Sequence, residues 1–172
     1  MTVTAPQGFV AAGVHAKIRK EKRDLALVRS LAPATGAAMW TQNRVLAAPV
    51  VVSKQHLELA QPQAVVVNSG VANAATGEQG LADATATAEH AASLLGLRAE
   101  QVIVLSTGVI GARLPLHRLL PALEPAVAAL SEDGGADAAA AIMTTDTRPK
   151  EAAVAHGGFA ETEGLRLYGV KV

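Results

Sequence analysis

Two short β-branched runs, each followed by small polar residues and a glycine, constrain the fold of this chain most strongly. Residues 64–70 are Ala-Val-Val-Val-Asn-Ser-Gly, and residues 101–108 are Gln-Val-Ile-Val-Leu-Ser-Thr-Gly. Apolar runs of this length are typical of buried strands. The stretch between them predicts a helix from about residue 80 to residue 95, which Gly96 is placed to end. Strand, helix and strand with short connections predict two parallel strands joined by a right-handed crossover.

The segments around this unit predict further strands and helices. Strands are expected at residues 24–28, 36–40 and 49–53, with a short helix at 54–60. A helix at residues 116–130 should be kinked or divided by Pro121 and Pro125, and an alanine-rich helix should cover residues 136–143. The tail predicts two strands, at 151–156 and 165–172. Because natural termini usually fray into solvent, a stop inside a strand indicates a chain that was cut, truncated or continued elsewhere.

Composition favours a single α/β domain over residues 1–172. This length corresponds to about one domain. Half of the residues are hydrophobic but only 2 % are aromatic, so the core must consist of Ala, Val and Leu. Charged residues make up 17 %, below the roughly 25 % usual for soluble domains. We therefore expect a partner subunit to cover part of the surface.

Charge and motif content exclude several functional classes. The net charge is zero and no basic stripe is present, which disfavours nucleic-acid binding. No secretory signal or membrane-spanning run is visible, so a cytoplasmic location is expected. Cysteine is absent, and the five histidines are scattered without metal-ligand spacing, so no metal site is predicted. The loop at residues 68–77 lacks both phosphate-binding glycine patterns and contains no lysine.

Two polar clusters are candidates for a site. Thr107 and Gly108 follow a strand, at the sheet end where α/β folds bind ligands, and their hydroxyl and N–H could hold the oxyanion of an acyl-transfer intermediate. An ordinary strand-ending turn explains the same spacing. Thr144 lies in the Thr-Thr-Asp-Thr cluster at residues 144–147, which could bind the polar end of an amino acid. That cluster could equally satisfy the last carbonyls of the preceding helix.

The order of several motifs resembles one family over nearly the whole chain. The motifs are Asn-Ser-Gly-Val-Ala-Asn-Ala-Ala-Thr-Gly at residues 68–77, Ser-Thr-Gly-Val-Ile-Gly at 106–111, Leu-Pro at 114–115 and the stretch 141–150. Together they are similar to the α chain of the bifunctional glutamate N-acetyltransferase/ornithine acetyltransferases of arginine biosynthesis. These are self-cleaving N-terminal-nucleophile enzymes. The resemblance implies an α/β sandwich that a separate β chain completes.

The resemblance also implies a reaction. The N-terminal threonine of the β chain would take the acetyl group of N-acetylornithine and pass it to glutamate. Some members of that family also accept acetyl-CoA, as a substrate rather than a cofactor. Thr107 and Gly108 match the family's oxyanion hole, and Thr144 matches a substrate-binding threonine. The nucleophile itself is not among these 172 residues, so a β chain is the expected partner, in an assembly of two α and two β chains or larger.

Two other functional classes remain open. One is a non-catalytic amino-acid-binding or regulatory domain with the same fold, which would bind ornithine or glutamate without turnover. The other is a subunit of a related N-terminal-nucleophile aminopeptidase or amidase, which would hydrolyse N-acetylornithine without transfer to glutamate.

Overall fold

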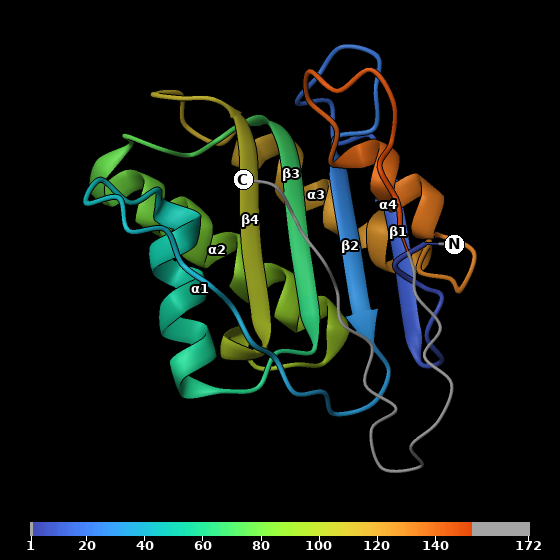
Figure 1. The fold of residues 1–172 in the computed structure, drawn as a ribbon. Coiled ribbons are helices and arrows are strands. Elements are labelled where there is room, and N and C mark those ends of the chain that lie inside the picture. The colour runs from blue at the N-terminus through green and yellow to red at the C-terminus, as the bar shows by residue number, and fades with distance from the viewer. Residues whose placement is uncertain (1, 153–172) are drawn as a thin grey trace.

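A mixed four-stranded sheet organises residues 2–152, the part of the chain that the computed structural model describes (Figure 1). The strands lie in chain order across the sheet: β1 (Phe9–Val14), β2 (Leu25–Ser30), β3 (Ala64–Val71) and β4 (Val102–Val109). β1 and β2 are antiparallel, as are β2 and β3, whereas β3 and β4 are parallel. The helices are α1 (Ala48–Leu59), α2 (Gly77–Leu95), α3 (Leu116–Ala128) and α4 (Gly135–Ala141), and a 3₁₀ turn, η1, covers Ala99–Gln101.

The predicted strand–helix–strand unit is confirmed. β3 and β4 are neighbours and pair in parallel without a slip, from Ala64 opposite Val102 to Val71 opposite Val109. α2 connects them, and its C-cap Gly96 has a left-handed backbone with φ of 68°. Both strands extend beyond the apolar runs, so the polar residues at their carboxyl ends belong to the sheet.

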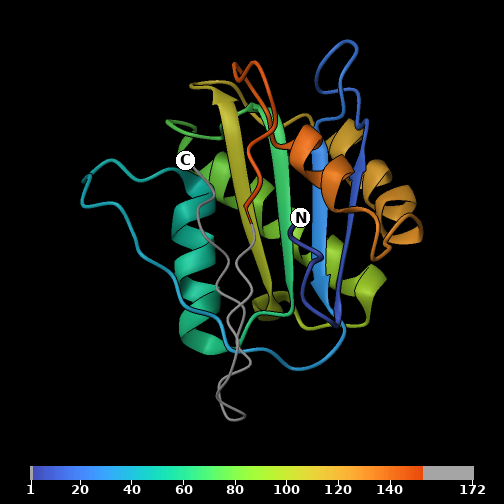
Figure 2. The same ribbon diagram turned by 45° about the vertical axis from the view of Figure 1, so that its right-hand side comes forward.

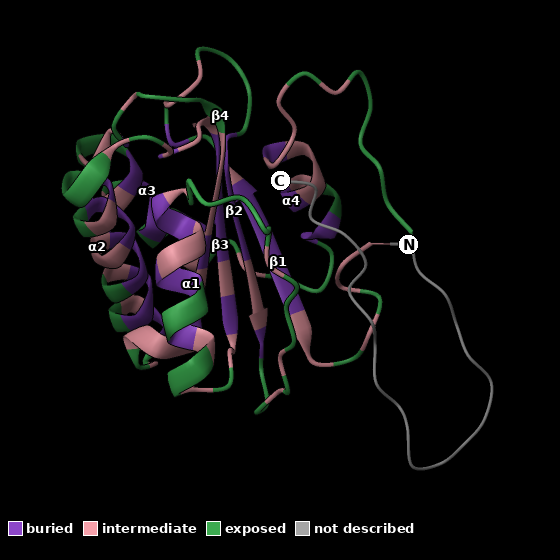
Figure 3. Cartoon of the chain, turned by 60° about the vertical axis from the view of Figure 1, so that its left-hand side comes forward, coloured by how far each residue is buried: buried purple, intermediate pink, exposed green. Residues whose placement is uncertain are grey.

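Helices pack against both faces of the sheet. The sheet-facing sides of α1, α2 and α3 are largely buried (Figure 3). Their buried residues, many of them alanines, form the larger core with residues of β2, β3 and β4. α4 forms a smaller cluster on the other face, where it packs on β1 and β2 (Figures 1 and 2). The prediction of a core built from Ala, Val and Leu is confirmed, because every fully buried large apolar side chain is Leu or Val.

The predicted strand at residues 49–53 is wrong, because this segment lies inside α1. Pro49 stands in the first turn, where a missing N–H costs no hydrogen bond. The helix presents Ser53 and His56 to the exposed edge of β4. The Ser53 hydroxyl donates to the Val104 carbonyl at 2.7 Å and accepts from the Val104 N–H at 3.0 Å, and His56 Nδ1 lies 2.8 Å from the Val102 carbonyl. α1 therefore protects the amino half of this edge strand.

Two further predictions are corrected. Residues 36–40 form no strand; they lie in an irregular connection whose Met39 side chain is fully exposed. α3 is one continuous helix through Pro121 and Pro125, so the prolines do not divide it. Both prolines lie four residues apart on the exposed side, where water can bond the carbonyls that they leave without a donor.

The C-terminal predictions fare differently. The alanine-rich helix is confirmed as α4, although it ends two residues earlier than expected. Residues 151 and 152 are irregular, and the rest of the two predicted tail strands lies outside the described residues. Within residues 2–152, no helix has the length and apolar character that a bilayer crossing requires.

Candidate active site

The two sequence candidates meet at one end of the sheet. The carboxyl ends of β3 and β4 lie at the upper end of the sheet in Figure 1, where the β1–β2 loop (residues 15–24) and the segment after α4 (residues 142–150) also gather. In the β3–β4 register, Ser69 is opposite Thr107 and Gly70 is opposite Gly108. Polar and small residues of four segments therefore share this edge.

Gly108 occupies a position that only glycine fits. Its φ of 138° lies in the region that other residues rarely adopt. A Cβ atom here would stand 2.2 Å from the carbonyl carbon of Gly70 and 2.6 Å from the backbone nitrogen of Val71. Gly70 also has a positive φ, 107°. The two glycines thus let the backbones of β3 and β4 touch where the polar residues begin.

The backbone of β4 has one free side at this point. β4 is the edge strand of the described sheet, and the Val104 N–H points away from β3 toward Ser53 of α1. Backbone groups alternate sides along a strand, so Gly108, four residues later, directs its N–H to the same open side. α1 covers Val104 but Gly108 is exposed. This N–H is therefore placed to donate to a ligand.

The Thr107 hydroxyl is a second donor beside it. Thr107 is half-buried on the strand, and among the described residues its hydroxyl has no hydrogen-bond partner. Its neighbour Ser106, by contrast, donates to Asn68 Oδ1 at 2.6 Å. A hydroxyl and an adjacent backbone N–H next to one open edge are the donors that an oxyanion hole requires.

The loop after Gly108 is held firmly. The Val109 carbonyl accepts from the Ala72 N–H at 2.9 Å, and the Gly111 N–H donates to the Ala74 carbonyl at 2.8 Å. Arg113 then forms a two-pronged pair with the buried Asp83 of α2, at 2.6 and 3.1 Å. Donation of these hydrogen bonds to the Asp83 carboxylate raises the pKa of Arg113. The end of β4 that carries the two donors is therefore fixed on both sides.

Thr144 follows α4 in the chain, and contacts from β3 and from the β1–β2 loop hold this segment at the same end of the sheet. The Ser69 hydroxyl donates to the carbonyl of Ala141, the last residue of α4, at 2.7 Å. The Arg19 guanidinium donates to the Met143 carbonyl at 2.6 Å and to the Thr144 carbonyl at 3.3 Å. Because Ser69 is the register partner of Thr107, one residue of β3 connects the oxyanion candidates with the Thr144 segment.

Sequence reasoning missed the β1–β2 loop as part of the site. Asp24 was included only in a strand, yet its side chain is fully buried and accepts from the N–H groups of Ala16 and Arg19. The signal was an acidic residue standing directly between a basic cluster and an apolar strand. This loop also borders a hollow of about 420 Å³ whose lining is mostly basic: His15, Lys17, Ile18, Arg19, Lys20 and Arg118. Such a rim attracts anionic groups to this end of the sheet.

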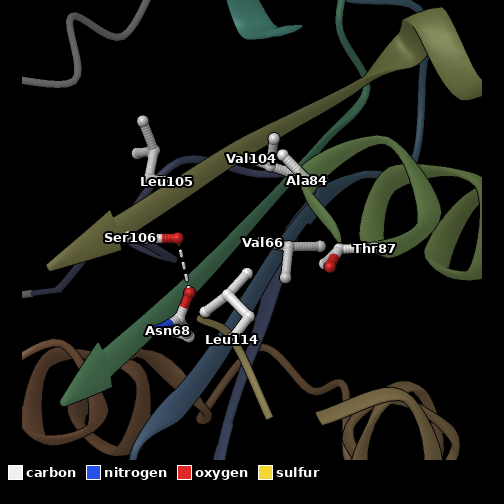
Figure 4. Close-up of a pocket in the computed structure, with 8 residues that line it drawn as sticks. All are labelled: Val66, Asn68, Ala84, Thr87, Val104, Leu105, Ser106 and Leu114. Carbon is white, nitrogen blue, oxygen red and sulfur yellow. Dashed lines mark hydrogen bonds between the residues drawn. The ribbon is translucent and has the colours of Figure 1, made fainter. Parts of the chain in front are cut away.

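A small pocket lies between β3, β4 and α2, on the face of the sheet that carries the larger core (Figure 4). Its lining is mainly apolar and includes Val66, Val104 and Leu114. Its polar groups already have partners, since Ser106 bonds Asn68 and Thr87 donates to the Asp83 carbonyl. We interpret this pocket as packing space.

The acidic and imidazole side chains of residues 2–152 form no metal-binding group. Among residues 2–152, no three His, Asp or Glu side chains gather closely enough to hold a metal ion. Asp146, after Thr144, pairs with Lys150, and this hydrogen bond lowers the pKa of the Asp146 carboxyl group.

Known proteins resemble this chain over nearly its full length. The family model described as the ArgJ family matches residues 10–171. The chain belongs to the ArgJ family. A protein of Symbiobacterium thermophilum, named arginine biosynthesis bifunctional protein ArgJ, is 52 % identical over 172 residues, which cover 97 % of this chain and 43 % of that protein. A Streptomyces coelicolor protein of the same name is 49 % identical over 177 residues, 99 % of this chain and 46 % of that protein.

Solved ArgJ-family structures confirm the α/β fold. Ornithine acetyltransferase from Mycobacterium tuberculosis, crystallised with ornithine, superposes with a TM-score of 0.82 at 46 % identity, covering 86 % of this chain and 81 % of that one. The Bacillus halodurans ArgJ structure gives 0.81 at 35 % identity, covering 86 % of this chain and 78 % of that one. The chain spans less than half the length of the curated ArgJ relatives described above.

Proposed function

We propose that this chain is the α chain of an enzyme that transfers an acetyl group from N-acetylornithine to glutamate. Residues 1–172 would form one domain, and a β chain from the same precursor would complete the sandwich and supply an N-terminal threonine. The two chains would assemble as two copies of each or more, in the cytoplasm. The observation that carries this proposal is a pair of hydrogen-bond donors at the end of β4. They are the Thr107 hydroxyl and the Gly108 N–H, which faces the open edge of the strand.

The chemistry follows from what these donors can stabilise. The β-chain threonine hydroxyl attacks the acetyl carbonyl carbon, and its proton passes through the threonine's own α-amine to the leaving ornithine nitrogen. Negative charge collects on the acetyl oxygen in the tetrahedral intermediate, and Thr107 and Gly108 donate to that oxygen. The C–N bond to ornithine then breaks. Glutamate's amine attacks the acetyl-threonine in the same way, which regenerates the hydroxyl and yields N-acetylglutamate.

Substrate binding is assigned to Thr144 and to the charge of this edge. Thr144 lies half-buried beside the strand ends, and its hydroxyl can bond the polar end of an amino acid. Both substrates carry carboxylates, which the basic rim around the 420 Å³ hollow attracts. Acetyl-CoA is proposed as a second acetyl donor, and no resident cofactor is required.

The test uses the enzyme assembled from this chain and its β chain. Incubation with isotopically labelled N-acetylornithine should place one acetyl group on the N-terminal threonine of a second polypeptide, as seen by peptide mass spectrometry. Adding glutamate should move the label to N-acetylglutamate, and replacing the donor by labelled acetyl-CoA tests the second donor. Binding of ornithine without labelling would favour the non-catalytic domain. Release of free acetate without transfer would favour a hydrolase.

A further inference from the structure

We propose that Arg19, held in place by the buried Asp24, is a positioning residue. It fixes the Thr144 segment (residues 142–150) against the end of β4 that carries Thr107 and Gly108. The inference rests on the proposed function, because it assigns Arg19 a role in substrate binding by that site. Arg19 lies in the β1–β2 loop, 125 residues before Thr144 in the chain. Its side chain contacts both parts of the candidate site.

Asp24 fixes the backbone from which Arg19 extends. The Asp24 carboxylate is fully buried, and its two oxygens accept from the Ala16 N–H at 2.6 Å and the Arg19 N–H at 2.7 Å. The backbone of Asp24 is bound as well: its N–H donates to Val14 and its carbonyl accepts from Ser69 of β3 at 2.8 Å. The loop therefore cannot move independently of β3.

The guanidinium of Arg19 binds the backbone just after α4, where the helix itself contributes only a long hydrogen bond, from the Met143 N–H to the Ala140 carbonyl at 3.4 Å. α4 ends at Ala141, and the chain turns into irregular structure at the next residues. Arg19 Nη1 donates to the Met143 carbonyl at 2.6 Å and Nη2 to the Thr144 carbonyl at 3.3 Å. Charged donors make stronger hydrogen bonds than neutral ones, and a planar guanidinium can hold two acceptors in one geometry. The orientation of Thr144 thus depends on Arg19.

The stem of the same side chain packs against Gly70, the residue of β3 opposite Gly108. A Cβ atom on Gly70 would lie 3.0 Å from Arg19 Cγ and 3.1 Å from Ile18 Cγ2, so both side chains pack closely over this glycine. Gly70 in turn contacts Gly108 backbone to backbone. Arg19 therefore sets the spacing between the Thr144 segment and the Gly70–Gly108 contact.

The decisive experiment compares Arg19→Gln and Arg19→Lys with Arg23→Gln in the assembled enzyme. Arg23 is the matched control, because it lies in the same loop and donates to the Gly13 carbonyl at 2.9 Å. Among the described residues it neither lines the basic hollow nor hydrogen-bonds residues 143–144. We expect Arg19→Gln to raise KM for N-acetylornithine about tenfold or more, with a smaller fall in kcat, because substrate binding by Thr144 is impaired. Arg19→Lys keeps one charged donor and should recover part of the loss. Arg23→Gln should keep both constants.

Two further readouts separate positioning from plain stabilisation. Combining Arg19→Gln with Thr144→Ala should add little to the KM of Thr144→Ala alone, because both changes remove the same contact with substrate. In hydrogen–deuterium exchange, peptides covering residues 142–150 should exchange faster in Arg19→Gln and Arg19→Lys, and their exchange should be unchanged in Arg23→Gln. The exchange measurement does not require an active enzyme. If Arg19→Gln does not fold, Arg19→Lys can be measured in its place.

The outcomes distinguish this inference from the proposed function. If the parent enzyme transfers no acetyl group, the proposed function fails, and the exchange experiment still tests the contact. If the parent is active and Arg19→Gln has a KM within about twofold of it, the positioning role is overturned. Additive effects of Arg19→Gln and Thr144→Ala, or unchanged exchange of residues 142–150, would overturn it equally.

Discussion

The two halves of the parallel β3–β4 pair use the same register for different purposes. In the amino half, valines such as Val66 and Val104 are almost fully buried, and α1 closes the strand edge through Ser53. In the carboxyl half three consecutive pairs are polar or lack a side chain: Asn68 with Ser106, Ser69 with Thr107, and Gly70 with Gly108. The edge of β4 is open there. The packed core therefore holds one half of the ladder rigid, and the same ladder fixes the position of the Thr107 hydroxyl and the Gly108 N–H at its other end.

This contrast predicts that substitutions in the carboxyl half should reduce turnover at little cost in stability, whereas those in the amino half should do the reverse. Gly108→Ala should have the largest effect. Its Cβ atom would collide with Gly70 at 2.2 Å, so the backbone N–H must move away from the oxyanion. We expect kcat to fall about 10³-fold. Gly96→Ala is the matched control, because Gly96 also has a positive φ but open space around it.

The control should lose about 1 kcal/mol of stability in thermal or denaturant unfolding, with kcat unchanged. A Gly108→Ala enzyme with parental kcat would mean that the close approach of the two strands serves packing alone.

Thr107→Ala should have the second-largest effect. Removing one oxyanion donor is expected to lower kcat by about 10²-fold or more, with the melting temperature preserved, because the hydroxyl has no partner among the described residues. Steady-state kinetics at saturating N-acetylornithine measures this change. Thr107→Ser retains the hydroxyl and should stay within a few-fold of the parent. Equal losses in both variants would point to packing of the methyl group instead.

Much of this arrangement could be predicted from the sequence, and the reasons are local. The short apolar runs at residues 64–67 and 102–104 are typical of buried strands, and a glycine such as Gly96 is typical of a helix end. The segment at 49–53 misled because β-branched residues favour strands, whereas packing of Ser53 against β4 decided for helix.

The site could be predicted only in part. Thr107, Gly108 and Thr144 were candidates because of their position after apolar elements, the family resemblance supplied their roles, and those roles remain predictions. The Arg19–Thr144 contact joins residues 125 positions apart, and no local pattern encodes such a contact. The burial of Asp24 likewise depends on β3, which supplies the Ser69 N–H to its carbonyl.

Val66→Ala tests the other half of the ladder. Val66 is 1 % exposed in the larger core, so losing two methyl groups should cost about 2 kcal/mol of unfolding free energy. Chemical denaturation measures this loss. At a temperature where the variant is folded, kcat should equal that of the parent. A large fall in kcat would show that the two halves are not separable in function.

Thr144→Ala should act on binding rather than on the chemical step. Loss of one hydrogen bond to substrate is expected to weaken binding by roughly 1–3 kcal/mol, seen as a higher KM for N-acetylornithine with kcat nearly unchanged. Thr145→Ala is the control, because Thr145 is exposed where Thr144 is half-buried. If the two variants have the same KM, Thr144 does not bind substrate.

The central claim is that the carboxyl half of β3–β4 stabilises the oxyanion formed during acetyl transfer. Its most direct test is the single-turnover rate at which N-acetylornithine acetylates the enzyme, measured by rapid quench for Thr107→Ala beside Val66→Ala. We predict that the first variant acetylates about 10²-fold more slowly than the parent and that the second keeps the parental rate. Parental acetylation by Thr107→Ala would contradict the account.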